Sequence, residues 1–310
     1  MQAIRTKLTL VLLAAALLIA PIFLGGYEHY ILCSVLVHAL VVLALVILIG
    51  YAGQISIGHA GFWALGAFAS GVSITQLQLP FVAAIVCAAL VAAVFGALLA
   101  IPALRVQGHY LAIATLGFAL ITQQVLFEWE SVTGGRKGLF VPRPTLFGFE
   151  FSSDLSLYYL FLAISAPLFW LAWRLPGTRF GARLISLKLS PIAAVSFGVP
   201  RAQYLVIAFT LSAAYAGISG AMFAALIGHI STETFSLGAS LGFLTAAVIG
   251  GVTSPLGAFL GSIYLTLAPE IFREFKDAQM VVYGFMLVLF VRFLPGGLVS
   301  LPSLLARLRR

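Results

Sequence analysis

The feature that most constrains this chain is a run of 76 residues, from His29 to Leu104, without a single Asp, Glu, Lys or Arg. A membrane-spanning helix takes about 20 residues, so this run alone is long enough to cross a bilayer about three times. Only 8% of the whole chain is charged, whereas soluble domains have roughly a quarter of their residues charged. The sequence therefore predicts a polytopic membrane protein and excludes a soluble globular domain.

The apolar segments predict an all-α fold of ten transmembrane helices, because a segment in lipid must satisfy its own backbone hydrogen bonds. The helices are expected at residues 8–26, 31–50, 58–76, 80–101, 109–127, 156–173, 203–228, 238–252, 256–271 and 279–298. The third and the eighth are short and glycine-rich, which indicates broken or re-entrant segments. Residues 1–310 are expected to form a single transmembrane domain. The N-terminal apolar stretch is assigned to its first span, since no convincing signal-peptide cleavage site follows it.

The distribution of charge predicts the orientation in the membrane. With the N-terminus in the cytoplasm and loops assigned alternately, twelve of the 17 basic residues fall inside, and all nine acidic residues fall outside or at outer helix ends. This agrees with the positive-inside rule, which also explains the net charge of +8 without nucleic acid. Both termini are therefore expected in the cytoplasm, with an outer loop at 128–155 and an inner loop at 174–202.

Chemistry-bearing side chains are scarce in the spans. Ionisable residues at mid-span are the usual mark of ion-coupled transport, and the acids here lie in loops or at helix ends. The titratable candidates near spans are His38, His59, His109 and His229. Cys33 and Cys87 lie in apolar runs and are interpreted as small packing residues. No metal-ligand spacing or arranged nucleophile is present, so the sequence predicts neither an enzyme nor a bound cofactor.

Small residues recur at four-residue spacing in several spans. Such rows let helix backbones approach closely in lipid, either within one subunit or between subunits. The rows are Ser212, Ala216 and Gly220; Gly242, Ala246 and Gly250; and Gly257 with Gly261.

The segment from Gly50 to Gly61 combines four glycines with polar side chains between two apolar runs. Irregular backbone at membrane depth is tolerated only where protein covers it or where it lines a water-filled path. In one interpretation Gln54, Ser56 and His59 offer hydrogen-bonding groups along a substrate path, as interrupted helices do in transporters. In the other, the segment is a cytoplasmic turn in which Ser56 caps the next helix.

The two long loops carry further signals. The outer loop holds TGGRKGL at 133–139, which lacks the strand–loop–helix context of a phosphate site. It is either a docking surface for an external partner or a solvated loop. The inner loop predicts a short helix, with Ser190 as its N-cap, Pro191 at its first position and Gly198 at its C-terminal end.

That short helix is expected to present Ile192, Val195 and Phe197 between flanking cations, Arg183 and Lys188 among them. A helix of this length is not stable alone. It must pack on lipid headgroups, on its own bundle or on a cytosolic partner.

Five stretches occur in this order: GYAGQISIGHAGF (50–62), VQGHYLAIATLGF (106–118), TGGRKGL (133–139), GARLISLKLSPIAAVSFGVPRAQYLVIAFTLSAAYAGISGAMFA (181–224) and VIGGVTSPLGAFLG (248–261). Together they resemble the LivM-type permease of branched-chain amino acid ABC importers. The resemblance covers the chain from about residue 30 to Gly297. It implies transport of Leu, Ile or Val across a bacterial inner membrane.

The resemblance also implies partners: two cytosolic ABC ATPases, a second, LivH-like permease in a heterodimer, and a periplasmic substrate-binding protein. The helix at 191–197 would then be the coupling helix that sits in a groove on an ATPase. ATP belongs to that partner, because this chain has no phosphate-binding GxxxxGK[ST] run. The coupling residues would be Arg183, Lys188, Ser190, Pro191, Ile192, Val195, Phe197 and Gly198.

The inner loop departs from the family, which usually carries acidic residues near the start of the coupling helix. We therefore expect docking here to rely on apolar contact plus Arg183 and Lys188. Alternatives remain for the function. A permease of the same fold could carry urea, short amides or other amino acids, a stand-alone channel or carrier would need no ATPase, and a purely structural subunit would tolerate changes at Gln54 and His59.

Overall fold

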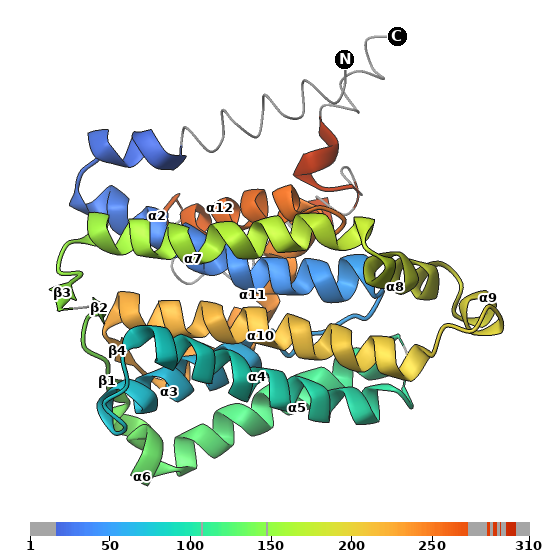
Figure 1. The fold of residues 1–310 in the computed structure, drawn as a ribbon, viewed down its shortest axis with the longest axis horizontal. Helices are drawn as coiled ribbons and strands as arrows, with labels where there is room; N and C mark the ends of the chain where they lie inside the picture. The colour runs from blue at the N-terminus through green and yellow to red at the C-terminus, as the bar shows by residue number, and fades with distance from the viewer. Residues whose placement is uncertain are drawn as a thin grey trace.

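The computed structural model describes residues 17–106, 108–146, 148–271, 284–285, 288–289, 292 and 296–301. Helices dominate this part of the chain (Figure 1). The α-helices are α2 (Gly26–Leu45), α3 (His59–Thr75), α4 (Phe81–Ala103), α5 (His109–Glu128), α6 (Glu130–Thr133), α7 (Asp154–Arg174), α8 (Arg179–Leu189), α9 (Pro191–Ser196), α10 (Arg201–Ile227), α11 (Leu237–Gly250) and α12 (Pro255–Ile271). The 3₁₀-helices are η1 (Ala20–Phe23), η3 (Gly135–Lys137), η4 (Leu175–Gly177), η5 (Thr232–Phe235) and η7 (Leu298–Ser300), and η2 (Val46–Tyr51) is a π-helix.

Eight of the predicted spans, from the second to the ninth, correspond to helices within a few residues at each end. Five helical segments are long and apolar enough to cross a membrane: Gly26–Tyr51, Phe81–Ala103, His109–Glu128, Asp154–Gly177 and Arg201–Ile227. The third and eighth spans are short, as predicted. The 14 residues of α11 extend about 21 Å at 1.5 Å per residue, less than the roughly 30 Å of a hydrocarbon core. About half of the first predicted span and most of the tenth lie outside the described residues.

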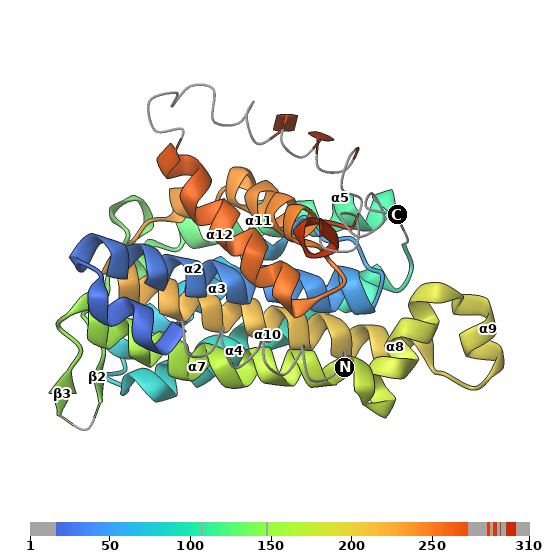
Figure 2. The same ribbon diagram turned by 90° about the horizontal axis from the view of Figure 1, so that it is seen from above.

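The centre of the bundle is α10, which packs against α2, α3 and α4 (Figures 1 and 2). Glycines allow the helix axes to approach closely. A Cβ built on Gly66 would overlap the backbone of Gly217, and one built on Gly220 would overlap the carbonyl of Trp63. The small-residue row of α10 therefore packs within this chain.

The same holds for the pair α11 and α12. A Cβ on Gly250 would meet the backbone of Gly257, and one on Gly261 would meet the carbonyl of Ala246. All three of these glycines and Ala246 belong to the predicted small-residue rows. Of the two interpretations that the sequence left open, packing within one subunit is confirmed for these contacts.

Two serines of α10 fasten that helix to α2. Ser212 Oγ donates a hydrogen bond to the carbonyl of Ala44 (2.7 Å), and Ser219 Oγ donates one to the carbonyl of Val37 (2.7 Å). The serines are seven residues apart on α10 and their acceptors are seven apart on α2, in the opposite order, so the helices run antiparallel.

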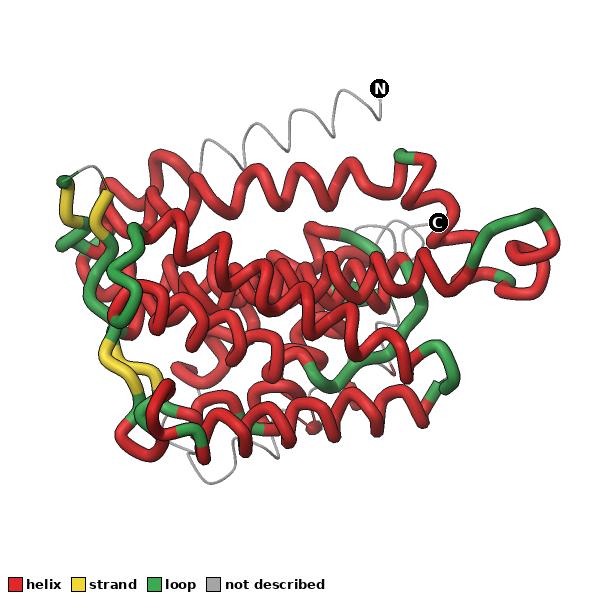
Figure 3. Tube along the Cα trace, turned by 60° about the horizontal axis from the view of Figure 1, so that its bottom comes forward, coloured by secondary structure: helices red, strands yellow, loops and turns green. Residues whose placement is uncertain are grey.

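The molecule has two distinct ends. Four two-residue strands gather at one end, while α8 and α9 project from the other (Figures 1 and 3). Strand β1 (Leu139–Phe140) pairs antiparallel with β4 (His229–Ile230), and β2 (Thr145–Leu146) pairs with β3 (Phe149–Glu150). The pairing of β1 with β4 places the loop 128–155 and the α10–α11 connection at the same end, as the predicted orientation requires of two outer loops.

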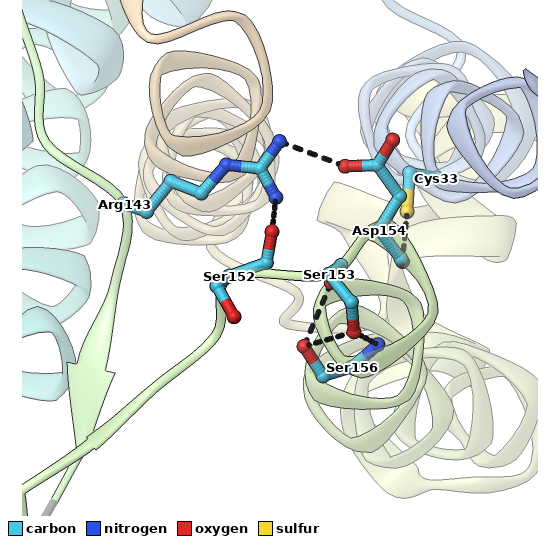
Figure 4. A network of polar contacts seen from close by, with 6 residues as sticks. All are labelled: Cys33, Arg143, Ser152, Ser153, Asp154 and Ser156. Carbon is cyan, nitrogen blue, oxygen red and sulfur yellow. Dashed lines mark hydrogen bonds and ion pairs between the residues drawn. The ribbon is translucent and has the colours of Figure 1, made fainter. Parts of the chain in front are cut away.

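The end of this loop is held against α2 and α7 by the polar network in Figure 4. Arg143 contacts the carboxylate of Asp154 (2.9 Å) and donates to the carbonyl of Ser152 (2.6 Å). Ser153 caps α7 by accepting from the backbone N–H of Ser156. The thiol of Cys33 on α2 approaches the carbonyl of Asp154 (3.7 Å). Cys33 is buried, in keeping with its interpretation as a packing residue.

Candidate functional site

The interrupted segment that follows α2 and the inner-loop helices meet at the end of the molecule opposite the strands. They enclose a polar cavity of about 150 Å³. Its walls come from four parts of the chain: the break after η2, the α4–α5 connection, the helices α8 and α9, and the start of α10. The lining residues are Ala52, Gly53, Gln54, Gly108, Leu187, Lys188, Pro191, Arg201 and Leu205. One residue predicted for substrate passage, Gln54, thus shares a cavity with two predicted for ATPase coupling, Lys188 and Pro191.

The break itself begins in the π-helix η2, where α2 widens before it stops. The backbone N–H of Ala52 bonds the carbonyl of Ile47, five residues back. π-Helical turns are rare and are frequent at functional sites. Gly50 within this turn packs directly against the carbonyl of Val252, so a side chain there would collide with backbone. Residues 52–58 are irregular, and α3 begins at His59.

Ser56 and His59 lie inside the protein, each with about 1% of its surface exposed. His59 Nδ1 lies 3.0 Å from Ser56 Oγ, and His59 Nε2 lies 2.9 Å from Ser212 Oγ. Since Ser212 gives its own proton to the carbonyl of Ala44, it accepts from His59 Nε2–H. His59 Nδ1 is then the acceptor for Ser56. Both imidazole nitrogens are occupied, and the chain of hydrogen bonds joins the break to α10 and α2.

Side chains of neighbouring helices satisfy one backbone N–H group of the break and one in the first turn of α3. The N–H of Ile57 donates to Thr115 Oγ1 of α5 (3.0 Å), and the N–H of Ala60 donates to Ser240 Oγ of α11 (3.2 Å). Gly58 packs so closely on the carbonyl of Thr115 that a Cβ would overlap it. The break is therefore covered by protein on this side, which is the condition under which irregular backbone survives at membrane depth.

Gln54 differs from Ser56 and His59. Its side chain is half-buried and lines the polar cavity, where Nε2 donates to the carbonyl of Ala52 (3.1 Å). Of the three residues predicted for a substrate path, Gln54 is the one that borders open space. The role of all three in transport stays a prediction.

Lys188 connects the inner-loop helices to the break. From the last turn of α8, its Nζ donates a hydrogen bond of 2.7 Å to the carbonyl of Gly50 in η2. The stem of the lysine covers Gly53, whose φ of +69° is left-handed and favours glycine. A cation at this point suits the free carbonyls of a helix end. The charge that the sequence predicted for ATPase docking thus has a partner within this chain.

Arg183 also has an intramolecular partner. Its Nη1 donates to the hydroxyl of Tyr204 (2.6 Å), and its guanidinium lies 5.8 Å from the centre of that ring. Phe180 stacks on Tyr204 with a centroid distance of 5.3 Å. This cluster fixes α8 to the first turn of α10.

The short helix of the inner loop is present as α9, and the capping prediction is confirmed. Ser190 accepts from the backbone N–H of Ala193, Pro191 occupies the first position, and Gly198 after the helix has a φ of +82°. Its apolar side chains face outward. Ile192 is 84% exposed, Val195 50% and Phe197 89%, so the expected exposed apolar tip exists in this structure.

The glycines of TGGRKGL in the outer loop make a tight turn. Gly134, Gly135 and Gly138 all have positive φ. Arg136 lies over the ring of Phe127 (5.4 Å to its centre). These contacts and backbone angles shape the tight turn that leads into β1, and they give no indication of a bound ligand.

The sequence prediction missed the residues that hold the site together. Helix α8 was not predicted, although Thr178 caps it by accepting from the N–H of Gly181. Thr115, Ser212 and Ser240 were not linked to the break. They are small polar residues in apolar helices, which is a detectable signal, but their partner across the bundle requires the fold.

Comparisons with known proteins agree on one family of transport proteins. Residues 29–291 match the family described as branched-chain amino acid transport system / permease component. The high-affinity branched-chain amino acid transport system permease protein LivM of Escherichia coli (strain K12) is 31% identical over 96% of this chain and 76% of its own length. The nucleoside ABC transporter permease protein NupC of Lactococcus lactis is 26% identical over 78% of this chain and 84% of its own length.

A third relative is the autoinducer 2 import system permease protein LsrC of Klebsiella pneumoniae, 31% identical over 53% of this chain and 48% of its own length. No solved structure matches the chain significantly. The resemblance noted in the sequence is confirmed by the family match, by the long alignment to LivM and by apolar helices that suit a multi-pass membrane protein. This chain belongs to the family of permease components of branched-chain amino acid transport systems.

Proposed function

We propose that this chain is a transmembrane permease subunit of an ABC importer that moves Leu, Ile and Val inward, driven by ATP hydrolysis on partner subunits. In the proposed assembly it forms a heterodimer with a second, LivH-like permease in a bacterial inner membrane. Two cytosolic ATPases bind the inner face, and a periplasmic binding protein delivers the substrate to the outer face. The observation that carries the proposal is the hydrogen bond from Lys188 to the carbonyl of Gly50.

The argument starts at the tip of α9. Its exposed Ile192 and Phe197 form an apolar surface on a helix of six residues, which needs a partner to pack on. We assign this surface to a groove of the ATPase. A movement of α9 is passed to α8, because only Ser190 separates the two helices.

From α8 the movement reaches the membrane-embedded break. Lys188 holds the carbonyl of Gly50, at the point where the π-helix ends. A π-turn followed by irregular backbone is a natural place for α2 to change conformation. ATP-driven displacement of α9 would therefore open or close the cavity beside Gln54, whose amide lines the exit of the path. In this scheme Ser56 and His59 keep the break in shape while the substrate passes.

The docking surface follows from the same contacts. Arg183 is bound to Tyr204 and Lys188 to Gly50, so both cations first of all hold α8 in place within this chain. We propose that they support docking by fixing the position of α9, and that the direct contact with the ATPase is apolar.

The test is reconstitution of the chain with its ATPases, second permease and binding protein in proteoliposomes. Uptake of labelled leucine that requires ATP, and that isoleucine and valine compete with, supports the proposal. Competition by urea, short amides or a nucleoside instead would assign a different cargo to the same machinery. Leucine flux through this chain without any ATPase would contradict the proposal and favour a channel or carrier.

A further inference from the structure

His38 occupies an unusual position for a histidine. It lies halfway along Gly26–Tyr51, which has the highest mean hydropathy of the five long segments. Between Cys33 and Leu48, every residue except His38 is buried. Within this stretch of the most apolar segment, the one partly exposed side chain is therefore an imidazole.

The hydrogen bonds of His38 leave one ring nitrogen free. Nδ1 lies 2.9 Å from the hydroxyl of Thr266 on α12. That hydroxyl gives its proton to the carbonyl of Ser262 (2.9 Å), so it accepts from His38 Nδ1–H. The tautomer that follows carries a lone pair on Nε2. Among the residues that the structure describes, none donates a hydrogen bond to this nitrogen.

Aromatic side chains lie beside His38. The ring of Trp63 lies 6.4 Å away, and that of Phe243 lies 6.2 Å away. Trp63 is 3% exposed and packs against Phe223 (4.3 Å) and Phe235 (5.0 Å). Its indole Nε1–H is buried and has no hydrogen-bond partner in the part of the chain that the structure describes. Such orphaned buried donors are rare in folded proteins and call for an explanation.

Two hydrogen-bonding groups without a partner among the described residues thus belong to rings whose centres lie 6.4 Å apart, an acceptor on His38 and a donor on Trp63, and His38 is at the middle of a membrane span. A polar residue at that depth is by default a functional candidate, and transporter substrate sites lie near the bilayer midplane. Packing alone does not explain His38, because a leucine would fill the same helix position without a polar atom.

We infer that His38 Nε2 is a cargo contact at the bilayer midplane, accepting a hydrogen bond from an N–H group of the substrate while Trp63 and Phe243 face its apolar part. This inference rests on the proposed transport function and assigns a substrate class to this position, a small amphipathic molecule with an N–H donor. The α-ammonium and aliphatic side chain of a branched-chain amino acid fit that description. Thr266 is a positioning residue, since it holds the ring so that Nε2 is the free nitrogen.

Labelling tests whether an aqueous route reaches this point. In a background with Cys33→Ala and Cys87→Ala, His38→Cys in native membranes is exposed to 2-aminoethyl methanethiosulfonate. We expect His38→Cys to react and leucine to slow the reaction. The control is Leu40→Cys, two residues away and fully buried, which should stay unreacted. If His38→Cys is no more reactive than Leu40→Cys, the inference is wrong, whatever the cargo of the wild-type chain is.

Transport tests the contact itself, in proteoliposomes that contain the whole importer. Loss of one hydrogen bond to a charged group corresponds to about a tenfold effect. We expect His38→Leu to lower the leucine imported per ATP hydrolysed by about this factor, and His38→Gln, which keeps an acceptor, to restore most of it. A merely structural role would lower uptake and ATP hydrolysis together.

The control on the same helix is Ser34→Ala, which loses only a bond to the carbonyl of Tyr30 and should leave the ratio unchanged. A His38→Leu importer with an unchanged ratio overturns the inference and leaves the transport function intact. A wild-type importer that moves no branched-chain amino acid contradicts the proposed function, and the labelling result then still decides whether position 38 lies on an aqueous path.

Discussion

Replacing Lys188 by methionine tests the connection between the inner loop and the interrupted helix. The methionine keeps most of the aliphatic stem over Gly53 but removes the ammonium group that bonds the carbonyl of Gly50 at 2.7 Å. Hydrogen bonds to charged groups contribute about 1.5–3 kcal/mol. Because Lys188 is an exposed residue, we take the lower end, about 1.5 kcal/mol, which corresponds to roughly a tenfold change in an equilibrium.

The assay compares leucine uptake and ATP hydrolysis in the same proteoliposomes. Lys188→Met should lower uptake by about tenfold while ATP hydrolysis continues, because the ATPases still engage the apolar tip of α9. Lys188→Arg keeps a cation within reach of the carbonyl and should retain more uptake than Lys188→Met. The matched control is Arg183→Met, which loses its bond to Tyr204 but not the contact with the break.

Two results would refute this reasoning. If Lys188→Met imports leucine at the wild-type rate, the hydrogen bond to Gly50 carries no coupling. If uptake, ATP hydrolysis and the yield of assembled complex fall in parallel, Lys188 stabilises the subunit and does not transmit movement. Thermal unfolding of the purified variant separates that second case from a coupling defect.

Three further predictions concern packing, docking and the outer loop. Gly220→Ala should destabilise the chain by about 2 kcal/mol, because the added methyl group meets a backbone carbonyl. The control Gly117→Ala places its methyl group in open space and should not destabilise the chain, and thermal unfolding in detergent compares the two variants. Phe197→Asp should abolish co-purification of the ATPases while leaving the unfolding midpoint unchanged, since Phe197 is 89% exposed; retention of the ATPases would place docking elsewhere. Arg143→Ala should destabilise the chain by at most about 1 kcal/mol, and by less at high salt, because the ion pair of Arg143 with Asp154 is partly exposed. A loss of stability that does not depend on salt would show that the ion pair is not the cause.

The positions of the helices were predictable because the chain has to satisfy its backbone in lipid. That constraint makes apolar runs into helices, so α4 (Phe81–Ala103) was expected at 80–101 and α10 (Arg201–Ile227) at 203–228. Capping rules similarly located α9, since Ser190, Pro191 and Gly198 each act through the backbone nearby. Such local rules require no knowledge of which helices are neighbours.

The candidate site depends on contacts that no local rule reports. His59 looked like a group available to substrate, yet Ser212, far along the chain, occupies one of its nitrogens. Lys188 looked like a charge available to a partner, yet it binds a carbonyl in another helix. Helix α8 was missed because its polar, amphipathic sequence was interpreted as loop between two spans. In each case the decisive partner lies more than 100 residues away or depends on how helices pack.

The paired serines of α10 have a mechanical consequence. Two bonds to α2, at Ser212 and Ser219, lie about two helical turns or roughly 10 Å apart along the axis. Two hydrogen bonds at separate points resist both sliding and rotation of one helix against the other. We therefore expect α2 and α10 to move as one rigid unit in the bilayer. A displacement of the inner end of α10 would therefore move the middle of α2 by a similar amount. The π-turn beyond Ala44 is then the place where the backbone can change conformation.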